Sequence, residues 1–355
     1  MTSPLLSRPG AVPAEAPDAD VAAHYGEPAQ EGRALERGAG WIDRGNRGVV
    51  RVTGPDRLSW LHSLTSQYLT GTAPGTSTEA LVLDTKGHIR FHLSIIEDGT
   101  AVWAHTEPGA AEELAAFLDS MRFMLRVEVA DLSTERRVLT LAGPDRAAAL
   151  ATALEAAKAA GNASAEPDGG ADVLVREADD ETDLLLPADC VVPVAEALTA
   201  AGVRPVGLWA YEAHRIAVHR PRLGLDTDHR AIPHEMGWVG SAVHLEKGCY
   251  PGQETVARVH NLGRPPRRLI LLHLDGTAER LPERDAAIEL DGRKVGTVGS
   301  SARHHELGPI ALGLVKRNVP VDAEFTVDGI AAAQEVIVPP DTGANADITL
   351  RRRPA

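Results

Sequence analysis

The residues best suited to chemistry lie in one run of twelve, Lys247 to Arg258, with the sequence KGCYPGQETVAR. Cys249 lies between Gly248 and Gly252, and glycine allows backbone conformations and close ligand approach that other residues do not. The ammonium of Lys247, two residues before the cysteine, favours the thiolate, the form that attacks electrophiles and binds metals. The run therefore predicts a reactive thiol. The alternative is that Cys249 is a small apolar residue buried in a tight turn.

Polar side chains of the same run could complete a binding site. Gln253 and Glu254 could hold the polar edge of a ring, and Arg258 could hold an anionic tail. The other cysteine of the chain, Cys190, lies in the apolar stretch LLLPADCVV and is expected in the core. Two cysteines are too few for a zinc or iron–sulfur site built from cysteine alone, so no resident metal is expected.

Other candidate residues carry weaker signals. His304 and His305 are adjacent, but neighbouring side chains point apart on a strand, which disfavours a metal site there. Asp84 and Lys86 fall in a turn, DTKG, between two apolar runs, where both residue types are common. The basic segment 264–268 is short and is expected to be a solvated linker.

Composition excludes several classes of protein. The chain has 355 residues and a formal net charge of −14 (36 Lys and Arg against 50 Asp and Glu), which argues against a general electrostatic grip on nucleic acid. No stretch approaches the roughly 18–20 apolar residues of a membrane span, and no secretory signal pattern is evident. With so few cysteines and no export signal, we expect a cytoplasmic protein. From its charge and the lack of an apolar span, we expect no direct nucleic-acid or membrane binding.

The pattern of elements predicts three folded parts. Residues 1–34, rich in Pro, Ala and Asp without periodicity, predict a disordered tail. Alternating strands and helices over residues 35–235 predict α+β layers. Short strands with an Asp291-Gly292 hairpin signal predict a separate β module from about residue 266. The segment between them has little periodicity, and long irregular segments are unusual unless they are functional.

The motif block K-G-C-Y-x-G-Q-E-x-x-A-R at residues 247–258 resembles the signature of the YgfZ family. Members of that family are folate-binding paralogues of the glycine-cleavage T-protein, an aminomethyltransferase of the GcvT-like superfamily. Four shorter stretches agree with it in order and spacing. They are VTGPDR at 52–57, LDxKG at 83–87, LAGP at 141–144 and IPxE at 232–235. The resemblance therefore spans roughly residues 35–338.

The resemblance implies an α+β fold with three domains in a T-protein-like ring around a central folate-sized hole. We expect a first α+β domain from residues 35–70 plus 136–235 and a second from residues 71–135. A motif-bearing connector over residues 236–265 would then lead into a C-terminal β-barrel at residues 266–345.

The resemblance also implies a function. Such a protein would be a tetrahydrofolate-dependent accessory factor for the assembly or repair of iron–sulfur proteins, including one that modifies tRNA. Its partners would be folate and the iron–sulfur client proteins. Cys249 maps onto the essential cysteine of the family, as a nucleophile or a transient cluster ligand, and Lys247 maps onto the motif lysine. The cofactor-binding residues then expected are Tyr250, Gln253, Glu254, Arg258 and Lys86.

Two departures separate the chain from the T-protein pattern. The T-protein carries a catalytic aspartate on the strand after the glycine turn, but residues 88–92 (HIRFH) contain no carboxylate. The T-protein helix L-R-x-E-x-G appears as residues 214–219 (HRIAVH), with Ala217 in place of the glutamate that holds the pterin. Glu212, five residues earlier, is predicted to supply that carboxylate. The alternatives are a one-carbon transferase of the T-protein type and a non-catalytic scaffold.

Overall fold

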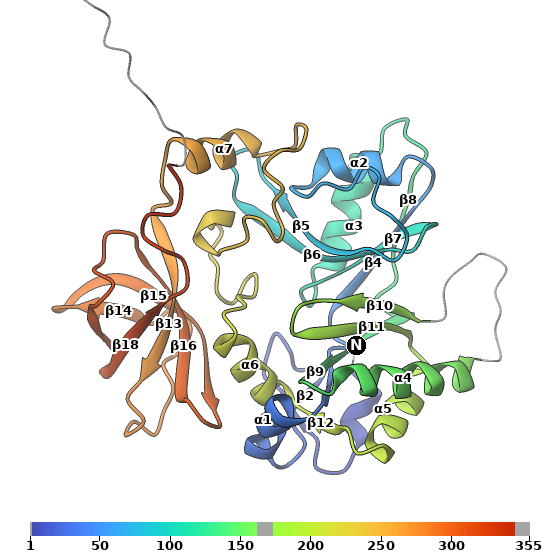
Figure 1. Ribbon diagram of the computed structural model, residues 1–355, viewed down its shortest axis with the longest axis horizontal. Coiled ribbons are helices and arrows are strands. Elements are labelled where there is room, and N and C mark those ends of the chain that lie inside the picture. Colours follow the sequence, from blue (N-terminus) through green and yellow to red (C-terminus); the bar gives the residue numbers. More distant parts are fainter. Residues whose placement is uncertain (1, 162–172, 345–355) are drawn as a thin grey trace, which may run out of the picture.

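A computed structural model describes residues 2–161 and 173–344 (Figure 1). In this part of the chain, strands form two five-stranded sheets, a closed six-stranded barrel and a small two-stranded sheet. Figure 1 shows the barrel on one side, the two larger sheets on the other, and helix α6 with an irregular segment between them. The expected α+β fold with a C-terminal β-barrel is confirmed.

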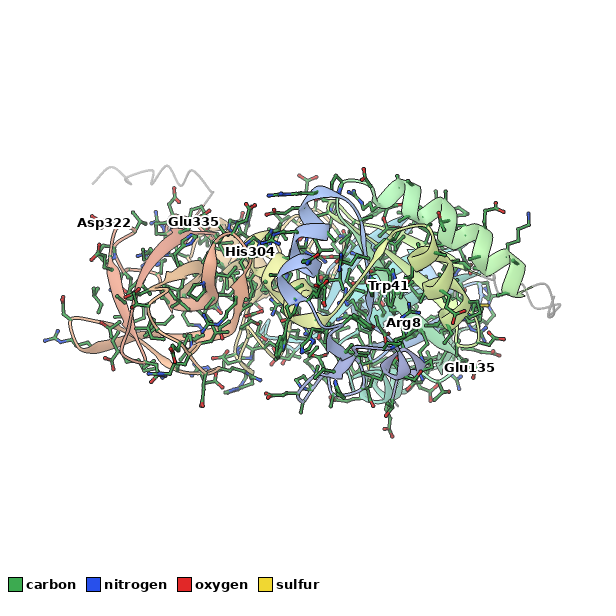
Figure 2. All side chains as sticks on the ribbon, turned by 90° about the horizontal axis from the view of Figure 1, so that it is seen from below. Arg8, Trp41, Glu135, His304, Asp322 and Glu335 are labelled. Carbon is green, nitrogen blue, oxygen red and sulfur yellow. The ribbon has the colours of Figure 1, made fainter. Side chains whose placement is uncertain are left out.

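The N-terminal segment is folded, so the prediction of a disordered tail is wrong. It contains a 3-10 helix at Pro4–Ser7, strands β1 (Val12–Pro13) and β2 (Ala22–His24), and helix α1 (Pro28–Arg37). Leu5 and Val21 are fully buried, and the guanidinium of Arg8 lies 5.3 Å from the ring centre of Trp41 (Figure 2). These contacts are made with residues far along the chain, which local composition cannot reveal.

The first sheet has the order β10-β11-β9-β3-β12. Its strands are β3 (Gly40–Asp43), β9 (Arg136–Ala142), β10 (Leu174–Glu177), β11 (Glu181–Pro187) and β12 (Arg204–Val206). Helices α4 (Arg146–Gly161) and α5 (Val191–Ala200) pack on the face that carries Trp41 and Leu139. Helices α1 and α6 (Leu208–Ala217) cover the opposite face, which carries Ile42. The alternation of Trp41 and Ile42 between the two faces follows from the two-residue period of a strand.

The second sheet has the order β5-β6-β7-β4-β8. Its strands are β4 (Gly48–Thr53), β5 (Ser77–Leu83), β6 (Ile89–Glu97), β7 (Ala101–Thr106) and β8 (Glu128–Asp131). Helices α2 (Arg57–Leu64) and α3 (Ala111–Ser120) bury one face of it. Residues 35–70 were expected in the first domain, whereas β4 pairs with β7 and β8 of the second sheet. Local patterning identifies a strand but not its partner, so this boundary was misplaced.

The barrel closes in the order β13-β16-β15-β14-β17-β18. Its strands are β13 (Arg267–Leu274), β14 (Ala287–Leu290), β15 (Arg293–His304), β16 (Gly308–Lys316), β17 (Glu324–Val327) and β18 (Ile330–Val336). Asp291 and Gly292 both have positive φ, as the expected Asp-Gly hairpin turn requires. Ile270 points into the barrel, while Leu269 and Leu271 pack outward in a cluster with residues of α6 and the connector. This outer cluster fixes the barrel beside α6.

The connector between α6 and the barrel contains a 3-10 turn at Pro233–Glu235 and helix α7 (Gln253–Asn261). Ser66 holds it to the second α+β unit, because its hydroxyl donates to the carbonyl of Ala242 and its carbonyl accepts from the backbone N–H of His244. None of the helices in the described ranges has the length and apolar character needed to cross a membrane.

Candidate functional site

A central cavity of about 240 Å³ lies where the two α+β units meet the connector. Its walls come from strands β5 and β6, the start of β11, helix α6 and the segment after it, and connector residues 236–241. Arg44, Arg47 and Glu107, from loops at the ends of strands, complete the wall. No described residue of the barrel and none from Lys247 to Arg258 is among the lining residues. The cavity and the motif are therefore two separate parts of the candidate site.

The arginines of the cavity wall are held by carboxylates. Arg222 donates to Asp18, Glu107 and Glu212, at distances between 2.9 and 3.2 Å. Arg220 donates to Asp180 at 2.9 Å and also to Glu181. Because each guanidinium is fixed by opposite charges, the wall presents ordered donors and acceptors to a ligand.

Behind this wall, Asp183 is the centre of a buried network. It accepts hydrogen bonds from Thr140 Oγ1 at 2.6 Å and from Arg176 Nη1 and His105 Nε2, both at 2.9 Å. Burial alone would raise the pKa of Asp183, but His105, Arg176 and Arg44 outweigh it and hold that pKa well below its usual range. Asp183 is therefore ionised throughout the physiological range.

His105 is the titrating member of this network. Its Nδ1 accepts from Arg47 Nε at 2.7 Å, so its proton lies on Nε2, and burial lowers its pKa to about 4. Unfolded histidine has a pKa of about 6.5. Between these two pKa values the unfolded chain binds a proton that the folded chain does not bind. The contribution of His105 to the free energy of unfolding is therefore fully present above about pH 6.5 and is lost as the pH falls toward about 4. We expect a loss of about 2 kcal/mol between pH 7.5 and 5.

Urea unfolding of the wild type and of His105→Gln, at pH 7.5 and pH 5, measures this contribution. The variant is less stable at both values, but its loss between them is smaller because it has one fewer titrating group. An equal loss of stability between pH 7.5 and pH 5 in the two proteins would contradict the assignment of this pH dependence to His105.

One wall of the cavity is aromatic. His92, on β6, stacks on Trp238 of the connector with ring centres 4.7 Å apart and planes 13° apart. His92 Nε2 also lies 3.2 Å from Glu79 Oε2, and Arg176 donates to Oε1 of the same carboxylate at 2.8 Å. Residues 88–92 lack a carboxylate, but the neighbouring strand β5 supplies Glu79 to the cavity. Burial raises the pKa of Glu79, yet the charges of His92 and Arg176 outweigh it and lower that pKa overall.

The cavity residues fit the pterin ring of a reduced folate. Asp180 Oδ2 is buried and has no hydrogen-bond donor among the described contacts, with His214 Nε2 at 3.6 Å. Burial raises the pKa of Asp180, but His214 and Arg220 outweigh it and lower the pKa to about 2. The ionised carboxylate of Asp180 in the cavity lining suits the amino and N–H groups of a pterin, and the aromatic wall formed by Trp238 and His92 suits its ring.

Glu212 lies behind this wall. Its Oε1 accepts from Arg222 at 2.9 Å and its Oε2 accepts from Arg215 at 2.5 Å. Burial raises the pKa of Glu212, but the two arginines outweigh it and lower the pKa to about 2. Glu212 thus positions two cavity arginines, and its direct contact with folate stays a prediction.

The end of α6 shows a second difference from the T-protein motif. His219 stands where the T-protein pattern L-R-x-E-x-G has glycine, and it adopts a left-handed φ of 63°. A side chain in this conformation costs roughly 1 kcal/mol, which glycine avoids. We expect His219→Gly to raise the free energy of unfolding by about 0.5–1 kcal/mol, after loss of its half-exposed pairing with Glu335.

The neighbouring residue gives the matched control. Val218 has a φ of −92°, so Val218→Gly gains nothing in the folded state and is expected to destabilise the protein. Urea unfolding midpoints compare the two variants. A loss of stability in His219→Gly would show that the histidine side chain contributes more than its conformation costs.

The motif loop presents Cys249 to solvent, whereas Cys190 is buried as expected. Gly252 has a φ of +81°, and a Cβ there would lie 2.7 Å from the carbonyl oxygen of Asp84. Only glycine therefore lets the turn that bears Lys86 pack against the start of α7. These facts remove the alternative in which Cys249 is a buried turn residue.

Lys247 ties this loop to helix α2. Its Nζ donates to the carbonyl oxygens of His62 and Thr65 and lies 4.8 Å from the ring centre of Tyr250. Burial lowers the pKa of Lys247 to about 8 and raises that of Tyr250 to about 12. Lys247 therefore anchors the loop, and its effect on the Cys249 thiol stays a prediction.

The remaining motif residues follow on α7. Gln253 Nε2 donates to the carbonyl oxygen of Lys247 at 3.2 Å, while Glu254 and Arg258 are exposed, as is Lys86 on the adjoining turn. The sequence pattern thus singled out one set of residues around Cys249, and their roles stay a prediction. It gave no sign of the cavity wall, whose residues come from distant segments without a local motif and include Glu79, His92, Asp180 and Trp238.

Comparison with known proteins agrees with this architecture. The model of the GCVT N-terminal domain family matches residues 6–167. An aminomethyltransferase of Herpetosiphon aurantiacus is 27% identical over 323 residues, which cover 87% of each chain. A putative chloroplastic transferase of Arabidopsis thaliana is 26% identical over 302 residues, covering 80% of this chain and 67% of its own.

Among solved structures, the glycine cleavage system aminomethyltransferase T of Bartonella henselae superposes with a TM-score of 0.78. The match covers 95% of this chain and 96% of that one at 22% identity. The fold is therefore that of the aminomethyltransferase, and these matches together support placing the chain in the GcvT-like aminomethyltransferase superfamily.

Proposed function

We propose that this chain is a cytoplasmic folate-binding protein of the YgfZ type that supports the assembly or repair of iron–sulfur proteins through Cys249. The observation that carries the proposal is the exposed thiol of Cys249 on a loop in which Lys247, Tyr250 and Gly252 are buried. Lys247, Tyr250 and Gly252 hold the loop in place, so the thiol is presented in a defined position to a client protein.

Tetrahydrofolate in the central cavity is the second part of the proposal. When bound, it supplies amine nitrogens that accept one-carbon units. Trp238 would stack on the pterin, the carboxylate of Asp180 would accept from its amino edge, and the paired arginines would keep the other wall rigid. The residues that line the cavity from the strand after the glycine turn are His92 and Ser94, and the nearby Glu79 already binds His92 and Arg176. That pairing disfavours direct replacement of the T-protein aspartate by Glu79.

Anaerobic calorimetric titration with tetrahydrofolate tests the cavity. We expect the wild type and Cys249→Ala to bind with equal affinity, and Trp238→Ala to bind at least tenfold more weakly. Trp209→Ala is the matched control, because Trp209 is 57% exposed and stacks only on His24 among the described rings. Absence of binding to the wild type would overturn the folate part of the proposal while leaving the Cys249 part open to its own test.

A one-carbon transferase of the T-protein type is the second candidate, favoured by the aminomethyltransferase relatives. Its candidate carboxylate is Glu79, which is already paired with His92 and Arg176. It predicts turnover with tetrahydrofolate and an aminomethyl donor, and loss of that turnover in Glu79→Gln. Turnover by the wild type that Cys249→Ala retains would favour this candidate over the accessory role.

A further inference from the structure

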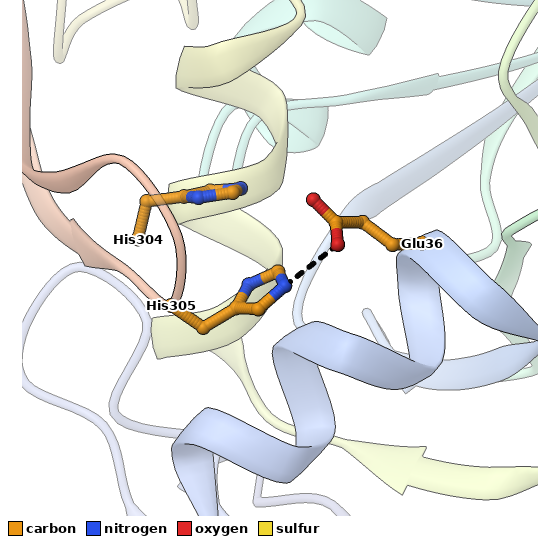
Figure 3. Close-up of side chains that lie close together, drawn as sticks. All are labelled: Glu36, His304 and His305. Carbon is orange, nitrogen blue, oxygen red and sulfur yellow. Dashed lines mark hydrogen bonds and ion pairs between the residues drawn. The ribbon is translucent and has the colours of Figure 1, made fainter.

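Glu36, His304 and His305 meet where the barrel packs against helix α1 (Figure 3). Adjacent histidines point apart along a strand, but β15 ends at His304 and the chain turns toward β16. The two rings consequently lie with centres 4.5 Å apart and planes 34° apart. His305 Nε2 lies 2.9 Å from Glu36 Oε2, and one ligand atom from each residue falls within 4.8 Å of the others. The expectation that the two side chains diverge is therefore wrong.

We propose that Glu36, His304 and His305 bind a divalent transition-metal ion, with Zn²⁺ as the best match, and that this ion links the barrel to α1. Two imidazole nitrogens and one carboxylate form a common three-residue donor set for zinc, with water as the fourth ligand. Ligand atoms around tetrahedral zinc lie roughly 3.3 Å apart, given bonds of about 2.0 Å. The present separations, up to 4.8 Å, must therefore shorten by up to about 1.5 Å.

Helix α1 is shaped to receive His305. Gly32 lies one helical turn before Glu36, and a Cβ at Gly32 would lie 2.8 Å from His305 Nδ1. Residues four apart share one face of a helix, so the glycine makes room for the ring while the glutamate reaches its other nitrogen. The side chain of His305 is only 4% exposed, and His304 is 9% exposed. Buried imidazoles beside a carboxylate are partly desolvated before any ion arrives.

Without a metal ion, His304 makes hydrogen bonds that metal binding would break. His304 Nδ1 accepts from the backbone N–H groups of Glu306 and Leu307, both at 3.2 Å, so its proton lies on Nε2. Metal binding at Nε2 moves this proton to Nδ1 and gives up those two long contacts. We therefore expect an exchangeable site, weaker than the closed zinc sites on which small folds depend.

The position of the site gives it a structural consequence. Near it, Arg37 and Glu306 form an exposed ion pair at 3.1 Å between α1 and the same turn, which contributes little on its own. An ion bound by Glu36 and the two histidines would add a second, stronger link between the first α+β unit and the barrel. Bound zinc should therefore raise the melting temperature of the full chain.

The test is titration of the chelator-treated full chain with Zn²⁺, followed by calorimetry, and with Co²⁺, followed by visible absorption. We expect one equivalent to bind, with the intense d–d bands of four-coordinate cobalt. Affinity should fall at least tenfold in Glu36→Gln and in His305→Ala. In Gly32→Ala all three donors remain, but the added methyl crowds His305, so a severalfold loss is expected. Zinc should raise the melting temperature of the wild type and not of His305→Ala.

A second histidine–carboxylate group provides the matched control. His273 and His219 lie 3.3 and 3.5 Å from the carboxylate of Glu335, in a more exposed position. His273→Gln is expected to leave zinc affinity unchanged. Loss of the bound equivalent in His273→Gln, or unchanged affinity in His305→Ala, would overturn the proposal. So would a wild-type protein that binds no ion, and circular dichroism confirms the fold of each variant.

Discussion

Cys249→Ala is expected to abolish the support of iron–sulfur enzymes while leaving the protein as stable as the wild type. The thiol is exposed, and truncation of an exposed side chain away from special features changes stability by less than about 0.5 kcal/mol. The loop does not need the sulfur for its conformation, because Lys247 and Gly252 hold it through backbone contacts. Activity and melting temperature should therefore separate in this variant.

Two measurements on one set of variants test the separation. Iron–sulfur enzyme activity is assayed in cells that lack the native gene and carry each variant, and melting temperature is measured on the purified proteins. Cys190→Ala is the control, because Cys190 is buried at the start of α5. It should lose stability and keep activity below its melting temperature. Full activity in Cys249→Ala would instead favour the scaffold, in which the fold acts without chemistry at the thiol.

The conformation of the motif loop could be predicted in part from sequence because the requirements on it are local. A positive φ at Gly252, its close approach to the Asp84 carbonyl and the anchoring by Lys247 all lie within or beside one short segment. The barrel could also be predicted from sequence. Its short strands follow the two-residue periodicity of a strand, and the Asp291-Gly292 turn follows the known preferences of hairpin turns. In both cases a local conformational rule determines the outcome.

The cavity and the N-terminal segment could not be predicted in this way. Asp18 lies in a segment whose composition is typical of disorder, yet it binds Arg222, which is 204 residues away along the chain. Glu79 and Arg176 likewise meet across 97 residues. From sequence alone, charged residues in such segments are expected on the solvent-exposed surface. Only the tertiary structure shows that they are buried with their partners. The same dependence on tertiary structure brings His304 and His305 together at the end of a strand.

Asp183→Asn is expected to destabilise the protein more than any of the other variants. The carboxylate is fully buried and is the shared partner of Arg176, Arg44 and His105. The amide retains the shape but loses the charge, which leaves the two guanidinium groups with less compensation. Removing one partner of a buried ion pair typically costs about 3–5 kcal/mol. Total stability is commonly about 5–15 kcal/mol, so this loss is a large fraction of it.

Urea unfolding followed by tryptophan fluorescence measures the effect, because Trp41 and Trp103 are buried within the first two units. Asp179→Asn is the matched control, since a substitution at that exposed carboxylate should change the free energy of unfolding by less than about 0.5 kcal/mol.

The effect of Asp183→Asn should extend to the cavity, because Arg176 also holds Glu79 and, through it, the ring of His92. Tetrahydrofolate affinity should consequently fall in Asp183→Asn even at temperatures where the variant is folded. A loss of less than about 1 kcal/mol would show that other carboxylates, chiefly Glu79 and Glu181, already compensate Arg176 and Arg44. In that case the network would act as a set of interchangeable charges, and the rigidity of the cavity wall would not depend on Asp183.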